Sequence, residues 1–174
     1  LVTADPYSKI INPADRDTAM LFGDGASATW LSEEAGWQIG VADFGIQSQQ
    51  HDALQTRDDG HLYMNGRAVF TFAATQVPAS VKRVLEKAQL GMADMDQVFL
   101  HQGSRYIVDT LAKRIGAEGK TPFAASAYGN TVSSSVPMML ALHLKPEWHK
   151  VLLCGFGVGL SWATCLLEKN NDHS

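Results

Sequence analysis

The hydrophobic pattern of this chain changes its period several times, and this alternation restricts the fold more than any other feature of the sequence. Trp37, Ile39 and Val41 recur at every second position, which is typical of a strand. Apolar side chains in residues 77–88 and 107–115 instead recur at the spacing of one helix face. Such alternation indicates an α/β domain in which helices cover a mixed sheet.

Turn and capping signals give the expected bounds of the first two helices. Pro78 suits the first turn of a helix, and Gly91 lies just past the end of the same apolar stripe. Ser104 has the side chain of a helix cap, and Gly116 follows the second stripe as its stop. We therefore expect one helix from about Pro78 and a second from Ser104.

The C-terminal third of the chain predicts one more helix and a pair of strands. Asn130 or Ser133 is the expected cap of the helix, which tolerates Pro137 only in its first turn. Residues 151–154 and 160–167 are apolar and are separated by glycines, so we expect two neighbouring strands there.

Three other segments complete the expected order of elements. Residues 18–31 are two apolar stretches around Gly23-Asp24-Gly25, which predicts a strand, a tight turn with positive φ, and a strand. Residues 48–66 are polar and predict a surface excursion that ends in a turn. Residues 96–100 predict a short buried strand that ends at His101.

Length, charge and cysteine content exclude several classes of protein. The 174 residues suffice for one domain, and the net charge of −4 offers no basic field for nucleic acid. No apolar run has the length of a membrane span. Cys154 and Cys165 are too few for a disulfide framework, so the cytoplasm is the expected location.

The first residues of the chain suggest a piece of a longer protein. The segment 1–6 lacks the basic and apolar regions of a signal peptide and begins as if inside a strand. We therefore expect residue 1 to be a cut point and residues 1–174 to form a single domain of a larger enzyme.

Several short motifs follow one another along nearly the whole chain. They are Asp15-Arg16 with Leu21-Phe22-Gly23-Asp24-Gly25-Ala26, residues 64–70 (MNGRAVF), residues 101–104 (HQGS), residues 128–137 (YGNTVSSSVP) and residues 155–162 (GFGVGLSW). Each motif is weak alone, but the ordered set resembles the 3-oxoacyl-[acyl-carrier-protein] synthase III family.

The resemblance implies a thiolase-like fold made of two related halves, with the active site between them. All of the motifs belong to the C-terminal half, for which we expect a mixed five-stranded sheet flanked by helices. The nucleophilic cysteine of the family belongs to the N-terminal half, which is absent here. The isolated chain is therefore expected to be inactive in the complete condensation.

The family's reaction is implied as well. An acyl-thioester acylates the cysteine, a malonyl-thioester loses carbon dioxide, and the resulting enolate attacks the acyl group. The product is a 3-oxoacyl-thioester of fatty acid or polyketide-type biosynthesis. The resemblance further implies an acyltransferase that forms a cytoplasmic homodimer and acts on acyl carrier protein or coenzyme A thioesters. It implies no cofactor, metal, nucleic acid or membrane.

His101 and Asn130 are the expected catalytic pair. Decarboxylation develops negative charge on the thioester oxygen, and two neutral hydrogen-bond donors directed at that oxygen stabilise it. Both residues lie where a strand or loop meets an expected helix start, whose partial positive charge disfavours an imidazolium ion. A neutral imidazole donates one hydrogen bond, and the carboxamide donates without titrating.

The resemblance assigns further residues to the site. The backbone N–H of Val158, in the loop that begins at Gly157, is expected to bind the oxyanion at the acyl-cysteine carbonyl. Phe156 is expected to line the acyl pocket. The expected contacts of the pantetheine arm are Gly66, Phe70 and Ser104, and those of the carrier protein are Lys113 and Arg114.

One departure from the family pattern leaves alternatives open. The family reads His-Gln-Ala-Asn where this chain has His101-Gln102-Gly103-Ser104, and its asparagine helps to hold the pantetheine arm. An acyltransferase of the same fold that acts on a hydroxyl or amine is therefore a second hypothesis. The lack of a nucleophile candidate motivates a third, a non-catalytic partner subunit. His101 as a structural histidine and Asn130 as a helix cap are the simpler interpretations of those residues.

Other features of the sequence are less informative. The glycines at 155, 157 and 159 resemble a dinucleotide loop, but a strand-like segment follows them where that motif requires a helix. His51, His61, His143, His149 and His173 show no metal-ligand spacing. Cys154 and Cys165 lie in apolar strand patterns and are expected to be buried.

Overall fold

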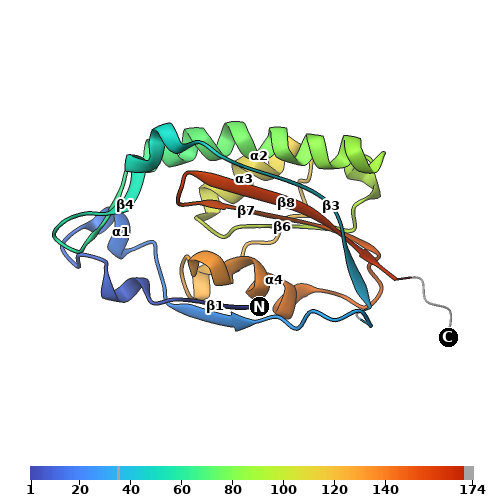
Figure 1. Cartoon of the computed structure of the whole chain (residues 1–174), viewed down its shortest axis with the longest axis horizontal. Coiled ribbons are helices and arrows are strands. Elements are labelled where there is room, and N and C mark those ends of the chain that lie inside the picture. Colours follow the sequence, from blue (N-terminus) through green and yellow to red (C-terminus); the bar gives the residue numbers. More distant parts are fainter. Residues whose placement is uncertain (35, 171–174) are drawn as a thin grey trace.

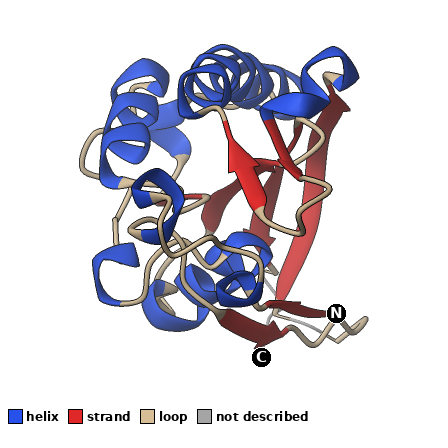
Figure 2. Cartoon of the chain, turned by 90° about the vertical axis from the view of Figure 1, so that its left-hand side faces the viewer, coloured by secondary structure: helices blue, strands red, loops and turns tan. Residues whose placement is uncertain are grey.

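A four-stranded mixed sheet lies at the centre of the structure, with helices on both of its faces (Figures 1 and 2). The computed structural model describes residues 1–34 and 36–170. The strand order is β3–β8–β7–β6, with β6 parallel to β7 and the other neighbours antiparallel. The strands are β3 (Trp37–Ile46), β6 (Gln97–Leu100), β7 (Lys150–Gly157) and β8 (Ser161–Lys169).

The expected α/β class and mixed sheet are confirmed, but the expected fifth strand is absent from the main sheet of the described residues. The apolar stretch before Gly23 is not a strand, because Asp15 accepts a hydrogen bond from the Asp17 N–H and starts a short helix, α1 (Arg16–Ala19). The other short strands form two separate pairs. They are β1 (Val2–Asp5) with β2 (Gly25–Ala28), and β4 (Leu54–Thr56) with β5 (Leu62–Met64).

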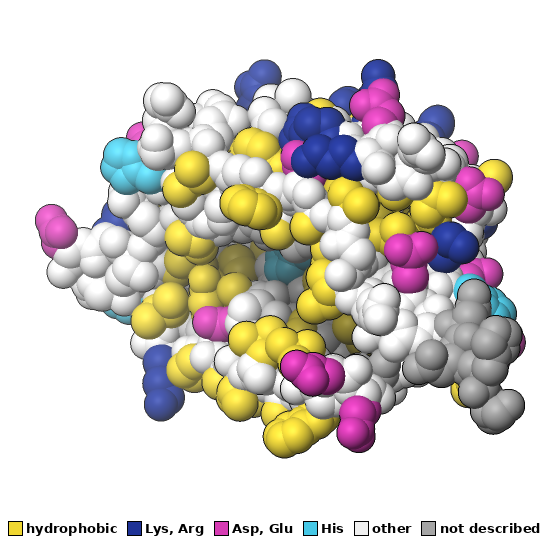
Figure 3. All heavy atoms as spheres, turned by 45° about the vertical axis from the view of Figure 1, so that its right-hand side comes forward, with side chains coloured by type: hydrophobic (Ala, Val, Ile, Leu, Met, Phe, Trp, Pro, Cys, Tyr) yellow, Lys and Arg dark blue, Asp and Glu magenta, His cyan; other side chains and the backbone are white. Residues whose placement is uncertain are grey.

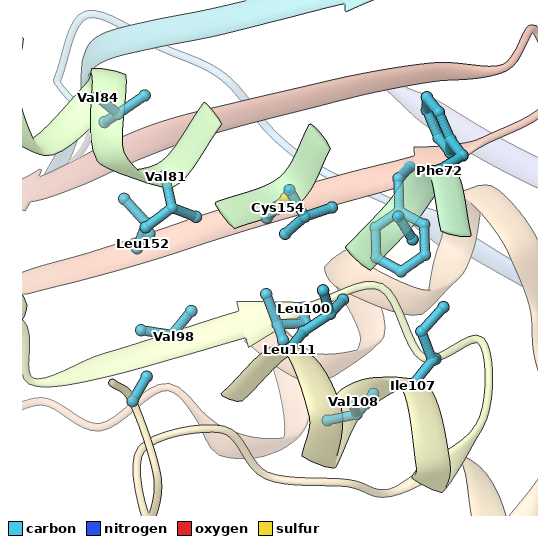
Figure 4. Packing of buried hydrophobic residues seen from close by; sticks show 14 of the residues in the cluster. Phe72, Val81, Val84, Val98, Leu100, Ile107, Val108, Leu111, Leu152 and Cys154 are labelled. Carbon is cyan, nitrogen blue, oxygen red and sulfur yellow. The ribbon is translucent and has the colours of Figure 1, made fainter. Parts of the chain in front are cut away.

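Helix α2 (Gly66–Ala88) covers one face of the sheet and begins well before the expected start. Asn65 caps it, since its Oδ1 accepts a hydrogen bond from the Ala68 N–H at 3.0 Å. Its apolar face packs on β3, β7, β8 and α3, and Figure 4 shows Val81 next to Leu152 of β7. Burial of each such aliphatic side chain stabilises the fold by about 1.5–3 kcal/mol.

Pro78 lies inside α2 rather than in its first turn, and a contact from another helix compensates for it. Proline has no N–H, so the carbonyl of Ala74, four residues earlier, lacks its helical partner. Arg114 donates a hydrogen bond from Nη1 to this carbonyl at 2.8 Å. The guanidinium group therefore completes the backbone hydrogen bonding of α2 and ties it to α3.

Helix α3 (Arg105–Ile115) follows β6 and has the expected bounds. The Ser104 hydroxyl accepts a hydrogen bond from the Ile107 N–H at 3.3 Å, and Gly116 ends the helix with φ of +68°. Both capping predictions are confirmed.

Helix α4 (Ser135–His143) lies on the opposite face of the sheet from α2 (Figure 1). Neither Asn130 nor Ser133 caps it, because the helix begins at Ser135 and Ser134 holds the N-cap position, without a side-chain capping bond. Pro137 does lie in that first turn, as expected. A small apolar cluster joins α4 to the sheet through Phe99, Met139, Val151 and Leu167.

A carboxylate fixes the edge strand β3 to α2. Asp43 accepts two hydrogen bonds from Arg83 at 2.8 Å, one from Ser80 and one from the Trp162 indole. The Arg83 guanidinium, with the two neutral donors, holds the pKa of the Asp43 carboxyl far below its usual range. No helix of the described residues is long and apolar enough to cross a membrane.

The contact at Pro78 generates a stability prediction. Arg114→Ala is expected to lower the free energy of unfolding by about 1–2 kcal/mol, because it leaves the Ala74 carbonyl without its partner. Urea denaturation of the protein that carries this chain measures the change. Lys113→Ala, one position away and exposed, is the matched control and is expected to change stability by less than about 0.5 kcal/mol.

A second background makes the test specific. In Pro78→Ala the new N–H supplies the helical partner of the Ala74 carbonyl, so Arg114→Ala is expected to cost less there. An equal loss in both backgrounds would contradict this account of the arginine.

Candidate active site

A cleft of about 770 Å³ opens where β6 and β7 end and where β8 begins. Three helices start at its rim, since Gly66 of α2, Ser104 before α3 and Ser135 of α4 all line it. Figure 3 shows a hollow in the surface with many hydrophobic side chains on its wall. The partial positive charge of three helix N-termini therefore lies around one apolar cleft.

The floor of the cleft is the sheet face that carries very small side chains. Gly155 pairs with Ala163, and Gly157 pairs with Ser161, so these four residues share one face. Their size leaves room above the sheet for a substrate chain.

His101 lies at the carboxyl end of β6, inside the cleft. Its backbone N–H donates a hydrogen bond to the Cys154 carbonyl at 2.8 Å, which extends the parallel pairing of β6 with β7 by one residue. Its ring is buried and meets the Phe156 ring edge to face at 5.1 Å. Burial lowers the pKa of His101 to about 4, while the backbone carbonyl of Val132 opposes that shift. Burial therefore favours the neutral imidazole that was expected from the sequence.

Two neighbours of the His101 ring were not predicted from the sequence. The Ser135 hydroxyl lies 2.7 Å from Nδ1, and the Val132 backbone lies against the ring. Val132 has φ of +53°, which is unfavourable for a β-branched residue and is typical of strained functional sites. The serine run in the fourth motif was the only signal in the sequence for Ser135.

Asn130 lines the same cleft as His101, so the structure brings the expected pair together. Its side-chain Oδ1 accepts a hydrogen bond from the Val132 N–H at 2.9 Å, which leaves the amide N–H groups to donate elsewhere. Its backbone is held by Leu21 and Gly23, through N–H···O bonds of 2.9 Å on either side of an isolated parallel bridge to Phe22.

Gly23 and Gly129 allow this loop pairing, which corrects the expected role of the Gly23-Asp24-Gly25 turn. Gly23 does not have a positive φ; a Cβ atom there would lie 1.8 Å from the Tyr128 carbonyl oxygen. Gly129 has φ of +78°, and a Cβ atom on it would lie 2.9 Å from the Gly23 nitrogen. Direct contact of two backbones therefore positions Asn130.

Phe156, Gly157 and Val158 line the cleft beside His101. Among the described residues the positive-φ positions outside glycine are Gln89 and Val132, so Val158 has an ordinary backbone conformation. The valine side chain is half exposed, and its presence does not strain the loop.

The three expected pantetheine contacts, Gly66, Phe70 and Ser104, also line the cleft. Phe70 stacks on Tyr106, with ring centroids 5.3 Å apart. The Ser104 oxygen accepts the capping bond from Ile107, so its hydroxyl proton is left to donate. The two expected carrier-docking residues, Lys113 and Arg114, lie outside the cleft lining on the last turn of α3.

Neither cysteine of the chain has the properties of a nucleophile. Cys154 is buried between strands, and burial raises the pKa of its thiol to about 12. Cys165 lines the cleft, and burial raises the pKa of its thiol as well. Both therefore disfavour the reactive thiolate. The described residues contain no group of three or more side chains that could hold a metal ion, and His173 lies outside them.

Comparison with known proteins gives the same family for both ends of the chain. The family model of the 3-oxoacyl-[acyl-carrier-protein (ACP)] synthase III C terminal matches residues 85–169, and the model of 3-oxoacyl-[acyl-carrier-protein (ACP)] synthase III matches residues 1–49. The beta-ketoacyl-[acyl-carrier-protein] synthase III of Lactococcus lactis subsp. cremoris (strain SK11) is 32% identical over 189 aligned positions. The chain belongs to this family.

Solved structures of synthase III proteins have the same fold. The enzyme from Pseudomonas aeruginosa PAO1 superposes with a TM-score of 0.86 and 32% identity, over 100% of this chain and 58% of that one. The priming β-ketosynthase from the R1128 polyketide biosynthetic pathway superposes with a TM-score of 0.81 and 29% identity, over 98% of this chain and 57% of that one. The thiolase-like class predicted from the motifs is therefore confirmed.

The chain spans little more than half the length of these synthase III relatives. The Lactococcus alignment covers 97% of this chain and 58% of the relative.

The backbone contact at Gly23 generates a second prediction. Gly23→Ala is expected to lower the free energy of unfolding by about 1–3 kcal/mol, because its methyl group overlaps the Tyr128 carbonyl. Gly36→Ala is the matched control, since a Cβ atom there meets nothing within 4 Å. Chemical denaturation that gave equal stabilities for the two variants would contradict the proposed contact.

The depressed pKa of His101 generates a third prediction. An unfolded histidine titrates near 6.5 and the folded one near 4, so the unfolded state binds more protons between these values. The free energy of unfolding is therefore expected to fall by about 2 kcal/mol between pH 7 and pH 5 through this residue.

His101→Gln removes this titration and is expected to flatten the stability profile by that amount. The Asp43 and Asp96 carboxyls, whose pKa values are lowered, lose their stabilisation only below about pH 4, outside this window. Identical profiles for the wild type and His101→Gln would contradict a buried neutral imidazole.

Proposed function

We propose that the protein carrying this chain is a decarboxylating condensing enzyme that joins an acyl-thioester to a malonyl-thioester. The observation that supports this most is the presence of a neutral histidine and an asparagine amide in one apolar cleft. Neutral donors are suited to an oxygen that gains negative charge during the reaction and loses it afterwards. Membership of the synthase III family supports the same reaction.

In the proposed mechanism, His101 and the Asn130 amide donate hydrogen bonds to the thioester oxygen of the malonyl group. The bond between the malonyl carbon and its carboxylate breaks, carbon dioxide leaves, and the electron pair moves into an enolate held by the two donors. The enolate carbon then forms a bond to the acyl carbon, and the thiolate of the acylated cysteine leaves. The backbone N–H of Val158 holds the oxyanion at that second carbonyl.

The nucleophilic cysteine is proposed to lie outside residues 1–174, in another domain that closes the cleft. Two observations support this. Both cysteines of this chain have raised thiol pKa values. In addition, Phe44 and Ile46 are 80% and 66% exposed on the face that forms the cleft floor, next to Ala163 and Ser161. A further domain that covers this face would remove the two side chains from water.

The substrates are proposed to be carried on the phosphopantetheine arm of acyl carrier protein or coenzyme A. Gly66, Phe70 and the free hydroxyl proton of Ser104 at the cleft wall support this, because an extended arm requires an apolar wall with a few polar contacts. Lys113 is the better carrier-docking candidate of the expected pair, because the Arg114 guanidinium already donates a hydrogen bond to the Ala74 carbonyl of α2. No cofactor or metal is proposed, and a cytoplasmic homodimer is proposed from the family resemblance.

A second candidate function keeps the fold and changes the acceptor. Ser104 at the arm-binding position supports an acyltransferase that moves the acyl group to a hydroxyl or amine. Incubation of the full polypeptide with acyl- and malonyl-thioesters separates the two, because only condensation forms a 3-oxoacyl-thioester. A non-catalytic partner subunit would give no product at all.

The catalytic pair generates a fourth prediction. In the full polypeptide, His101→Ala is expected to abolish decarboxylation of a malonyl-thioester, and Asn130→Ala is expected to slow it about 100- to 1000-fold. Release of carbon dioxide from labelled malonyl-thioester measures both. His149→Ala, at a histidine that does not line the cleft, is the control that should keep the wild-type rate. Retained decarboxylation in His101→Ala would refute the proposed function.

A further inference from the structure

We propose that Ser135 is a positioning residue that keeps the single ring proton of His101 on Nε2. This inference rests on the proposed function of His101 as a hydrogen-bond donor. A neutral imidazole has one N–H group and one acceptor nitrogen, so its tautomer decides which nitrogen can donate. In a buried histidine the tautomer is set by the partner of the other nitrogen.

The hydrogen bonds of the Ser135 hydroxyl point to one direction of donation. Its oxygen lies 2.7 Å from His101 Nδ1 and at the outer limit, 3.5 Å, from the Gln102 backbone nitrogen. The Gln102 N–H is a donor only, so toward it the serine oxygen is an acceptor. Among the described residues, Nδ1 is the acceptor recorded for the hydroxyl proton, so we infer that this proton is directed at Nδ1 and that Nδ1 is the unprotonated nitrogen of the ring.

The position of the other ring nitrogen matches this assignment. Nε2 faces Gly103, since a Cβ atom built on Gly103 would lie 3.7 Å from Nε2. Gly103 in turn lines the cleft. The proton is thus held on the nitrogen at the cleft, while Nδ1 is occupied by a residue of α4. Ser135 is fully buried, so water does not compete for its hydroxyl.

The backbone carbonyl of Val132 is the opposing influence. It raises the pKa of His101 and is therefore an acceptor that competes for the ring proton. With the Ser135 hydroxyl present, Nδ1 is engaged as an acceptor. Without that hydroxyl, the carbonyl is free to draw the ring proton, and the fraction of His101 that can donate into the cleft falls.

Ser134 supplies a matched control, because it has the same side chain, the same full burial and the adjacent position. Its hydroxyl lies 2.8 Å from Thr3 Oγ1 and does not line the cleft. Ser134→Ala removes a buried serine hydroxyl whose hydrogen-bond partner is Thr3, not His101.

The first experiment reads the tautomer directly. The full polypeptide is labelled with ¹⁵N-histidine, and the ring signals of His101 are assigned by their loss in His101→Gln. At pH 7 the wild type is expected to show a protonated Nε2 and an unprotonated Nδ1. A protonated Nδ1 in the wild type would overturn the proposal, even if every serine variant failed to fold.

The second experiment links the tautomer to the reaction. Ser135→Ala is expected to shift the ¹⁵N signals toward the other tautomer and to lower kcat for malonyl-thioester decarboxylation about 10- to 100-fold, with little change in KM. Ser134→Ala is expected to leave both readouts near the wild type. Equal tautomers and equal rates in the two variants would overturn the proposal.

These outcomes are distinguishable from failure of the proposed function. If the wild-type polypeptide does not decarboxylate malonyl-thioesters, the function is wrong, and the NMR measurement still decides which nitrogen carries the proton.

Discussion

The parallel pairing of β6 with β7 is the constraint on which the candidate site depends. Leu100 pairs with Cys154, and the His101 N–H extends the ladder to the Cys154 carbonyl, so both strands end at one edge of the sheet. His101 then meets the Phe156 ring, and the loop that contains Val158 follows directly. Because parallel strands end together, residues from two distant parts of the sequence reach one cleft without any direct bond between their side chains.

The electrostatic character of the cleft follows from what surrounds that edge. Three helices begin there, and their N-termini favour negative charge in the cleft and disfavour an imidazolium ion. Burial of His101 acts in the same direction and is the larger effect on its pKa. A site built in this way offers donors and dipoles without a fixed positive charge. Such a site suits the proposed decarboxylation, in which a neutral thioester oxygen gains negative charge.

Much of this arrangement was predictable from the sequence, because it has local signals. The period-two pattern predicted β3, the Ser104 and Gly116 caps predicted α3, and the ordered motifs contained many of the residues that line the cleft. The start of α2 was placed too late because Pro78 resembled a helix start, and the partner that makes an interior proline tolerable lies on another helix. The backbone contact at Gly23 and the Ser135 hydroxyl were missed for the same reason. Each depends on a segment more than thirty residues away, and no local pattern carries that information.

The hydrogen bond from Arg114 to the Ala74 carbonyl also restricts the order in which this pair of positions could change over time. A lineage that replaces Pro78 first regains the backbone N–H, and the arginine then becomes free to vary. A lineage that replaces the arginine first must pass through a protein with an unpaired carbonyl in its longest helix. Substitutions at these two positions should therefore accumulate in one order, with Pro78 replaced before Arg114.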